Sequence, residues 1–344
     1  MAKRVRLSDD DGSTWSTLPG NTASISNEAG EIDDTIFGQN FASTQTGLIG
    51  WTVSANGLYK GFAGYVAKLL KIGMATSMTG EATTLVSGKT YQITATTKRI
   101  WDRSSIVVKD NAVTVDAADI ESIDYLFGRV TFASGYTVTS PVTIDGNYYP
   151  TAVVGCANQF TLTQTANAND NTCMDTAQAN SGHRTFEYGL KTVQLELTGI
   201  YKVANGWRDL LVNRTELIIE INPDGNSKSV ARGFFKVVNE DQSGDVGAIE
   251  QESATFNLAV PDDDLLETPF KWVFANDSTL NTSLQIAINA WQANTTIDIA
   301  YLPDGSTGIQ GDCVVTDVTL SGGLEVMNEF TVNVQGSGAL AAYP

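Results

Sequence analysis

An eleven-residue segment of this chain recurs eighty positions further on. Residues 215–225 read TELIIEINPDG, and residues 295–305 read TTIDIAYLPDG. In both copies an alternating run ends in Pro-Asp-Gly. This tripeptide favours a turn because proline presets φ, aspartate bonds its own backbone and glycine accepts φ > 0. Each copy therefore predicts a strand that runs into a turn.

The similarity extends on both sides of this segment. A short helix-like stretch precedes each copy, at residues 207–212 and 284–291, and a final apolar run follows at residues 254–260 and 330–334. The repeated unit is helix, strand, turn, strand, turn, strand. Self-similarity of this length indicates a duplicated module.

The first half of the chain contains a second repeated pair. Residues 48–59 alternate apolar and polar side chains, and residues 190–201 do the same. Their ends also match, since residues 56–60 read NGLYK and residues 198–202 read TGIYK. This alternation predicts a half-buried strand in each copy. Each strand follows a shorter strand and a polar loop, at residues 21–26 and 27–46 in one copy and 160–165 and 166–188 in the other.

Two intervening segments have their own patterns. Residues 62–72, FAGYVAKLLKI, have apolar side chains at helical spacing and end at Gly73, which predicts a surface helix. Residues 80–149 contain short β-type runs separated by Asp, Asn and Gly turns. This spacing predicts a small β-sandwich or an elaboration of a sheet.

The order of the repeated halves is first, first, second, second, which favours nesting. We expect an inner module at residues 155–261 inserted into an outer module, whose halves are residues 1–79 and 262–344, with residues 80–154 as an additional β segment. Insertion is tolerated where the ends of a domain lie close together at its surface. The alternative is a plain tandem, in which the first half is completed by the segment that follows it.

Composition agrees with a mainly β fold. The chain has many Thr, Val, Ile and Tyr residues, 31 glycines and only 17% charged residues, a mixture that favours strands and turns. We therefore expect two related β-sandwich or split-barrel modules, each with a short helix.

The charge balance argues against nucleic-acid binding. Net charge is −18, and it is uneven, with 12 basic and 15 acidic residues up to Val154 and 9 basic and 24 acidic residues after it. Phosphate binding needs Lys and Arg to displace counterions.

The sequence shows no apolar run near the roughly 20 residues of a membrane span, and no apolar stretch follows its basic start. We expect neither membrane insertion nor secretion.

Catalytic motifs are sparse. His183 is the only histidine, and it lies in a polar stretch without a GxSxG, HExxH, Walker A or GxGxxG pattern elsewhere in the chain. The nearest carboxylate pairs for glycoside hydrolysis are Glu216 with Glu220 and the run at residues 262–264. Residues 9–12 resemble the start of a calcium loop but lack its ligand spacing. We expect no enzyme activity, no metal and no cofactor.

The three cysteines show no metal-binding spacing. Cys156, Cys173 and Cys313 form no CxxC, and no histidine lies at a matching distance. Buried thiols are the expected state, and a disulfide between Cys156 and Cys173 is the alternative.

The repeated halves also resemble a known family. DDTIFG at residues 33–38, GLIGW at 47–51 and NGLY at 56–59 are similar to segments of the major tail tube protein of long-tailed bacteriophages. DNT at residues 170–172, YGL at 188–190 and the run from 233 to 260 carry the same resemblance. IDYLFG at residues 123–128 and PVTIDG at 141–146 look like a segment found beside the tube domain in such proteins. A typical member has one tube domain, so the duplication is a departure.

The resemblance implies a virion protein that is assembled in the host cytoplasm. Its copies would form rings whose inner wall is a continuous β-barrel, and stacked rings would guide DNA without binding it specifically. Other tail proteins would cap the tube ends. If a family ring contains six tube domains, two per chain imply a trimer with pseudo-sixfold symmetry, and a decorative second module would imply a hexamer.

Two sets of residues are candidates for these contacts. Alternation separates one polar strand face, which can line a wet channel while the other face is buried. The candidates for the channel wall are Thr52, Ser54, Asn56, Gln194, Glu196 and Thr198. The candidates for ring-to-ring contact, from the two polar loops, are Asp33, Asp34, Phe37, Asp170, Asp175 and His183. The competing hypotheses are a monomeric carbohydrate-binding or adhesion β-sandwich and, further off, a glycoside hydrolase.

Overall fold

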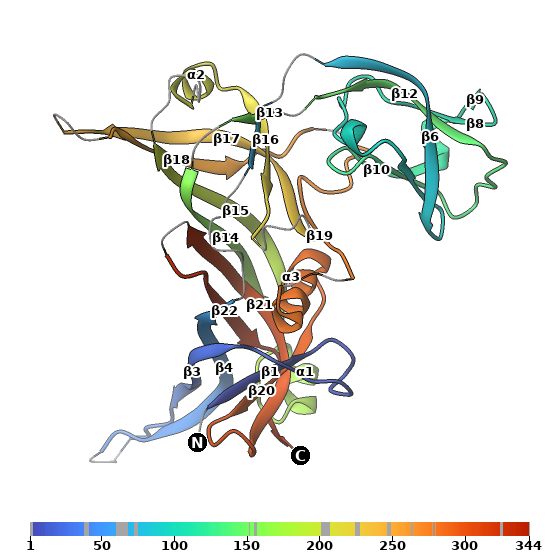
Figure 1. Cartoon of the computed structure of the whole chain (residues 1–344). Coiled ribbons are helices and arrows are strands. Elements are labelled where there is room, and N and C mark those ends of the chain that lie inside the picture. Colours follow the sequence, from blue (N-terminus) through green and yellow to red (C-terminus); the bar gives the residue numbers. More distant parts are fainter. Residues whose placement is uncertain are drawn as a thin grey trace.

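The computed structural model describes the chain except residues 1–2, 38–40, 60–67, 72–74, 151, 155–156, 201–206, 224–227, 246–248, 263, 277, 279, 324–325 and 344. It is mainly β, as the composition predicted, with long curved strands and a few short helices (Figure 1).

The helices are α1 (Met174–Ala179), α2 (Trp207–Val212) and α3 (Thr282–Ala293). The first strands in chain order are β1 (Arg4–Ser8), β2 (Ser16–Thr17), β3 (Gly20–Asp33), β4 (Thr44–Leu58), β5 (Lys68–Lys71), β6 (Thr76–Ser87), β7 (Thr90–Ile93), β8 (Val107–Asp110), β9 (Val113–Thr114), β10 (Ile120–Asp124), β11 (Arg129–Phe132) and β12 (Val142–Tyr148). The remaining strands are β13 (Ala152–Val154), β14 (Ala157–Asp170), β15 (Phe186–Ile200), β16 (Glu216–Ile221), β17 (Ser229–Ser243), β18 (Gln251–Leu258), β19 (Phe270–Phe274), β20 (Ile297–Leu302), β21 (Gly308–Gly323), β22 (Glu329–Gly336) and β23 (Ala341–Tyr343).

Eight long strands form the body of the main sheet. They are antiparallel and follow the order β3-β4-β22-β21-β14-β15-β18-β17. We call β3, β4, β22 and β21 the outer set, and β14, β15, β18 and β17 the inner set. Each set is a hairpin from one part of the chain paired with a hairpin from a later part, so the two sets have the same connectivity.

The two sets also match in register. In the outer set the β3–β4 pairing shifts between Gly20 and Thr22, and in the inner set the β14–β15 pairing shifts between Ala157 and Gln159. The second hairpins shift at matching places as well, after Val315 in β21 and after Val237 in β17. A bulge displaces one residue from the ladder, so matched bulges show that the strands correspond residue by residue.

Shorter strands complete each set in the same way. In the outer set β20 pairs with the first part of β21 and continues into β1 and β2, and β23 lies on the other edge of β21. In the inner set β16 pairs with the first part of β17 and continues into β5 and β13, and β19 lies on the other edge of β17.

One hydrophobic core lies beneath one face of this sheet. Trp51, Val53 and Leu195 from the long strands belong to it, together with Trp207 of α2 and Trp291 of α3. Helix α3 is capped at its start by Asn281, whose side chain accepts a hydrogen bond from Ser283 N at 2.9 Å, and at its end by Asn294 in the left-handed conformation. The sequence predicted α2 at its observed bounds and α3 within two residues of each end.

Strands β6 to β12 form a separate seven-stranded sheet with a core of its own, which includes Trp101 and Phe132. This small sandwich packs against the inner set, because Ile218 of β16 and Phe234 of β17 belong to the same cluster. Figure 1 shows it beside the main sheet. Its short strands were expected from the turn spacing of this segment.

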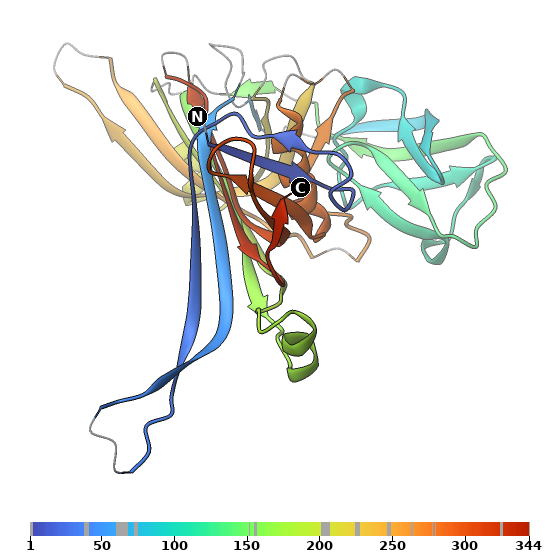
Figure 2. The same ribbon diagram turned by 90° about the horizontal axis from the view of Figure 1, so that it is seen from below.

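Two local expectations were wrong. Residues 68–71 form strand β5 rather than the end of a helix, because they pair with β16 on one side and β13 on the other; residues 62–67 lie outside the described part. Residues 27–46 are not mainly a loop, since β3 and β4 extend far into them as a hairpin that projects from the body (Figure 2). That hairpin is exposed on both faces, so no apolar alternation marks it in the sequence.

The other polar stretch is also partly ordered into secondary structure. Residues 166–188 contain the end of β14, helix α1 and the start of β15. The Pro-Asp-Gly turn expected in the second copy is present, with Gly305 at φ 85°. The matching turn of the first copy falls largely outside the described residues.

Replacing Gly336 by alanine is expected to destabilise the fold by about 1–3 kcal/mol, as overpacking of a filled core does. A Cβ at Gly336 would lie 2.0 Å from ring atoms of Trp51, and that indole is held by a hydrogen bond from Nε1 to Gly338 O at 2.9 Å. Urea unfolding measures the loss. Gly135→Ala is the matched control because nothing lies within 4 Å of its Cβ position; equal losses in both variants would show that the Trp51 packing is not the cause.

Candidate assembly surfaces

The face of the main sheet that is turned away from the core is polar across all eight strands. Directly opposite residues of an antiparallel pair point to the same face, so the registers define this surface. We call it the polar wall, and its side chains are Thr22, Ser24 and Ser26 of β3; Thr52, Ser54 and Asn56 of β4; Thr331, Asn333 and Gln335 of β22; Asp317, Thr319 and Ser321 of β21; Thr161, Thr163 and Thr165 of β14; Thr192, Gln194, Glu196 and Thr198 of β15; Ser253, Thr255 and Asn257 of β18; and Asn239, Asp241 and Ser243 of β17.

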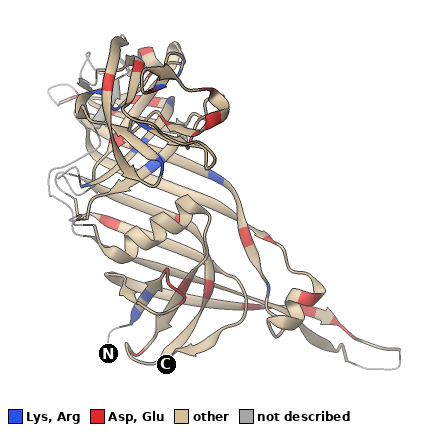
Figure 3. Cartoon of the chain, turned by 90° about the vertical axis from the view of Figure 1, so that its right-hand side faces the viewer, with Lys and Arg blue, Asp and Glu red and all other residues tan. Residues whose placement is uncertain are grey.

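The polar wall carries few charged side chains. Glu196, Asp241 and Asp317 are ionisable, and so are two exposed residues on the same face, Lys236 opposite Asn257 and Glu329 opposite Ser321; Figure 3 shows the long strands mostly free of charged colour. Burial raises the pKa of Asp317, although hydrogen bonds from Thr319 and Asn333 oppose the shift. The wall therefore presents mainly hydroxyl and amide groups.

Cross-strand hydrogen bonds hold parts of the wall in place. Thr22 Oγ1 donates to Asn56 Oδ1 at 2.8 Å, and the hydroxyls of Thr165 and Thr192 lie 2.6 Å apart. All six side chains that were predicted from the sequence for a channel wall lie on this one face, in β4 and β15. The equivalent positions of β3, β14, β17, β18, β21 and β22 were not predicted from the sequence, although the same alternation is present in β14, β18, β21 and β22.

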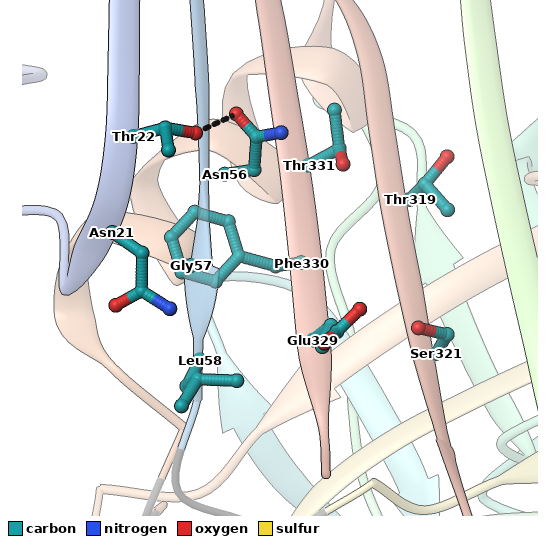
Figure 4. A pocket seen from close by; sticks show the side chains of 10 residues that line it. All are labelled: Asn21, Thr22, Asn56, Gly57, Leu58, Thr319, Ser321, Glu329, Phe330 and Thr331. Atoms are coloured by element: carbon teal, nitrogen blue, oxygen red, sulfur yellow. Dashed lines mark hydrogen bonds between the residues drawn. The ribbon is translucent and has the colours of Figure 1, made fainter. Parts of the chain in front are cut away.

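A shallow groove of about 270 Å³ lies at one end of the polar wall (Figure 4). Its side chains come from β3, β4, β21 and β22, and they include Thr22, Asn56, Thr319 and Thr331. Stacking of a sugar ring requires an exposed aromatic face. The aromatic residue here, Phe330, is 2% exposed and belongs to the core, so this groove offers hydrogen bonds but no stacking platform.

The sheet ends in two open strand edges. Strand β3 pairs with β4 on one side, and within the described residues no strand pairs with its other side. Strand β17 pairs with β16 only over residues 231–236, so on that side residues 239–243 face no described strand. Unpaired backbone groups at a sheet edge are a template for pairing with another chain.

The residues nominated for ring-to-ring contact lie at one end of the sheet. Asp33, Asp34 and Phe37 occupy the tip of the β3–β4 hairpin, where Phe37 is fully exposed. Hydrogen bonds from the side chain and the backbone N of Thr35, the latter at 2.9 Å, lower the pKa of Asp33, and Asp34 accepts a hydrogen bond from Gln45 at 2.8 Å. These carboxylates thus shape the tip.

Asp170, Asp175 and His183 lie in and around α1, which folds back toward β4. Gly182 O accepts a hydrogen bond from Ile49 N at 2.9 Å, and Arg184 N donates to Ile49 O at 2.8 Å. Asp170 pairs with Arg184 at 3.0 Å, and Asp175 lies in the first turn of the exposed helix. The structure therefore brings both nominated groups to the same end, with the hairpin tip reaching further (Figure 2).

The two glutamates considered for hydrolysis have structural partners. Glu216 pairs with Arg103 at 2.8 Å, and Glu220 accepts two hydrogen bonds from Arg232, at 2.7 and 2.9 Å. His183 Nδ1 lies 2.9 Å from Asn180 O. Ion pairs of this kind fix strand β16 against the small sandwich and β17.

Within the described part of the chain, no group of three or more His, Cys, Asp or Glu is placed to hold a metal ion. Cys313 is free and buried, as expected, whereas Cys173 is free and exposed, so the expectation of a buried thiol is wrong there; Cys156 lies outside the described residues. No helix of the described part is long and apolar enough to cross a membrane.

Asp298→Asn is expected to raise the melting temperature at pH 8 and to leave it almost unchanged at pH 4. Asp298 faces Asp312 across β20 and β21. Burial and this neighbouring carboxyl raise the pKa of Asp298 to about 7. A carboxyl whose pKa is higher in the folded than in the unfolded state stabilises the fold fully at pH values below its unfolded-state pKa. This stabilisation is lost as the pH rises through the folded-state pKa of about 7.

Thermal unfolding at both pH values, with Asp175→Asn in exposed α1 as the control, measures this difference. An equal shift at pH 4 and pH 8 would show that the like-charge pair does not control the effect.

No protein-family model matches the chain, and no curated protein matches it. A chain in the tail of an empty gene transfer agent particle with C6 symmetry is 14% identical, with a TM-score of 0.29 over 37% of this chain and 87% of that one. A chain in the virion of a native gene transfer agent particle is 13% identical, with a TM-score of 0.29 over 36% and 88%. At this TM-score the similarity carries no functional argument.

Proposed function

We propose that this protein is a structural subunit of a phage-type tail tube. The observation that carries the proposal is the polar wall, a curved eight-stranded surface of hydroxyl and amide groups that ends in two open strand edges. Such a sheet becomes a barrel when neighbouring copies supply the missing strands, and closure removes both exposed edges. The sequence resemblance to major tail tube proteins supports the same function.

The chemistry of the wall suits a conduit for DNA. A lumen rich in Lys and Arg would bind phosphates through counterion release and would hold the genome. Here acidic side chains outnumber Lys236 on the wall face, and the chain as a whole has a net charge of −18. A neutral to acidic lining lets DNA pass without adhering to it.

The proposed assembly is a ring that stacks into a tube. Because both strand sets carry the polar face, three chains would supply six sets and give pseudo-sixfold symmetry; a ring of six chains is the alternative if one set lies outside the wall. The hairpin tip and α1, at one end of the sheet, would contact the next ring. Other tail proteins would bind the two ends of the tube, which would be assembled in the host cytoplasm and remain in the virion.

Negative-stain electron microscopy of the purified protein, concentrated at moderate salt, tests this function. Rings or hollow filaments are expected. A chain that remains a monomer at every concentration and that binds glycans at the groove of Figure 4 would instead be a carbohydrate-binding protein, and the tube function would be rejected.

A further inference from the structure

The two strand sets meet inside the chain at one junction. Strand β14 of the inner set pairs with the second half of β21 of the outer set, with Thr161 opposite Ser321 and Gln164 opposite Val318. Leu162 and Leu320 face each other there and are fully buried. Gln164 also donates from Nε2 to Val318 O at 3.4 Å. This junction joins the first strand of one set to the last strand of the other.

The strands that correspond to this junction are the ones with open edges. The matched bulges make β3 the counterpart of β14, with Ser24 corresponding to Thr161 and Asn27 to Gln164. They also make β17 the counterpart of β21, with Ser243 corresponding to Ser321 and Glu240 to Val318. The chain therefore makes this contact once within itself, and within the described residues the equivalent contact is absent at the two edges of the sheet.

We infer that β3 of one copy pairs with the second half of β17 of the next copy, in the register of the internal β14–β21 junction. The transferred register places Ser24 opposite Ser243, Ile25 opposite Gln242 and Asn27 opposite Glu240 of the neighbour. The partner is a second copy of this chain, and this identity rests on the proposed function; the register itself rests on the internal repeat.

Alternate backbone N–H and C=O groups of β3 face its open edge, as this pairing requires. Ile49 in β4 bonds through both its N–H and its C=O to residues 182 and 184, away from β3. In an antiparallel strand successive residues bond to opposite sides, and the β3–β4 register is regular over residues 22–28. Ser24 and Ser26 therefore bond to β4, whereas the N–H and C=O groups of Ala23, Ile25 and Asn27 face the open edge.

The edge of β17 carries more polar side chains than the internal junction, which fits its exposure to solvent. Where the internal junction has Leu320 and Val318, both fully buried, the edge of β17 has Gln242 and Glu240. Polar and charged residues on an edge strand protect it from random pairing. The junction between copies is consequently held more by backbone hydrogen bonds than by apolar burial, which keeps the free chain soluble and makes each contact individually weak.

The position of Asn27 supports the same register. Its internal counterpart Gln164 is an amide that donates to the backbone carbonyl across the junction. Asn27 retains an amide at this position and is exposed in the single chain. In the inferred register it lies opposite Glu240, whose carbonyl corresponds to that of Val318.

Cysteine cross-linking tests this register directly. Because Ser24 bonds its backbone to β4, Ser24 and Ser243 would form a non-hydrogen-bonded pair, with Cα atoms about 4.5 Å apart, which a disulfide can span. The double variant S24C/S243C is made in a C156S/C173S background of the full chain. The matched controls are S24C/Q242C, with the second thiol on the opposite face, and S24C/D241C, which requires a two-residue slip. All four positions are exposed in the single chain.

Mild oxidation of assembled protein, followed by non-reducing electrophoresis, is expected to link more than half of the S24C/S243C chains into a ladder that ends at the closed ring, with at least fivefold less linkage in either control. Equal or stronger linkage in S24C/D241C or S24C/Q242C would overturn the register. Rings that form but never link at S24C/S243C would overturn this junction while leaving the tube function standing, and a chain that never assembles would overturn both.

Discussion

The double variant A23P/N27P is expected to fold as a monomer and to lose ring formation. Both residues direct their backbone N–H to the open edge of β3, and proline is tolerated on an edge strand where its missing N–H faces solvent. Each junction between copies would lose two backbone hydrogen bonds of about 0.5–1.5 kcal/mol each. Every 1.4 kcal/mol weakens association about tenfold, so a ring that needs several junctions at once is not expected to close. Sedimentation velocity measures the loss of rings.

The matched control is A23G/N27A, which keeps both N–H groups. It should still form rings, with at most the loss of the Asn27 amide contact at each junction, and circular dichroism should show all three proteins folded. If A23P/N27P forms rings at the parent concentration, β3 does not provide the edge that joins two copies. If Ser26→Pro, which removes a donor to β4, leaves the melting temperature unchanged, the assigned direction of these hydrogen bonds is wrong.

Placing aspartate at Phe37 and Phe41 is expected to abolish stacking of rings into tubes while rings still form. The exposed fractions of these side chains are 110% and 86%, and Ile36 beside them is 67% exposed. Apolar side chains so exposed at a projecting tip mark a surface that another protein covers. Burying one such side chain stabilises a contact by about 1.5–3 kcal/mol, so two per chain dominate a stacking interface.

Electron microscopy of F37D/F41D should show isolated rings, and tube length should fall by tenfold or more. Val113→Asp is the control, because Val113 is also 68% exposed but lies on the small sandwich. Tubes of normal length from F37D/F41D would exclude the hairpin tip as the stacking element, and short tubes from Val113→Asp would point to the small sandwich instead.

The sequence was most informative where burial imposes a period. In β4 and β15 the core side chains Trp51, Val53 and Leu195 alternate with exposed polar ones, and the strands could be predicted from that pattern. The repeat identified which strands belong together, because the same turn and apolar runs occur twice. The helices α2 and α3 were recognisable from their position before each repeated strand.

The sequence was least informative where a strand has no buried face or where pairing is distant. The projecting part of the β3–β4 hairpin is exposed on both sides and read as a loop. Strand β5 has helical apolar spacing, but pairing with β16 and β13 holds it as a strand. Such a tertiary preference overrides local propensity.

One of the two candidate surfaces could be predicted from the sequence, and the other could not. The face that carries Thr52 and Gln194 could be predicted, since alternation alone separates it from the core. The open edges of β3 and β17 could not, because an unpaired edge is a property of the assembled sheet and leaves no mark on one strand. The pairing of β14 with β21 joins residues far apart in the chain. It shows which contact is present inside the sheet and absent at the edges of β3 and β17.

The central claim is that neighbouring copies complete this sheet into a closed cylinder with the polar wall inside. Electron cryomicroscopy of the assembled protein tests it most directly. The expected density is a hollow ring of three chains with an unbroken strand wall, β3 next to β17 of the neighbour, and Thr52, Gln194 and Thr319 facing the lumen. A ring of six chains with only one strand set in its wall, or a wall whose polar face points outward, would contradict it.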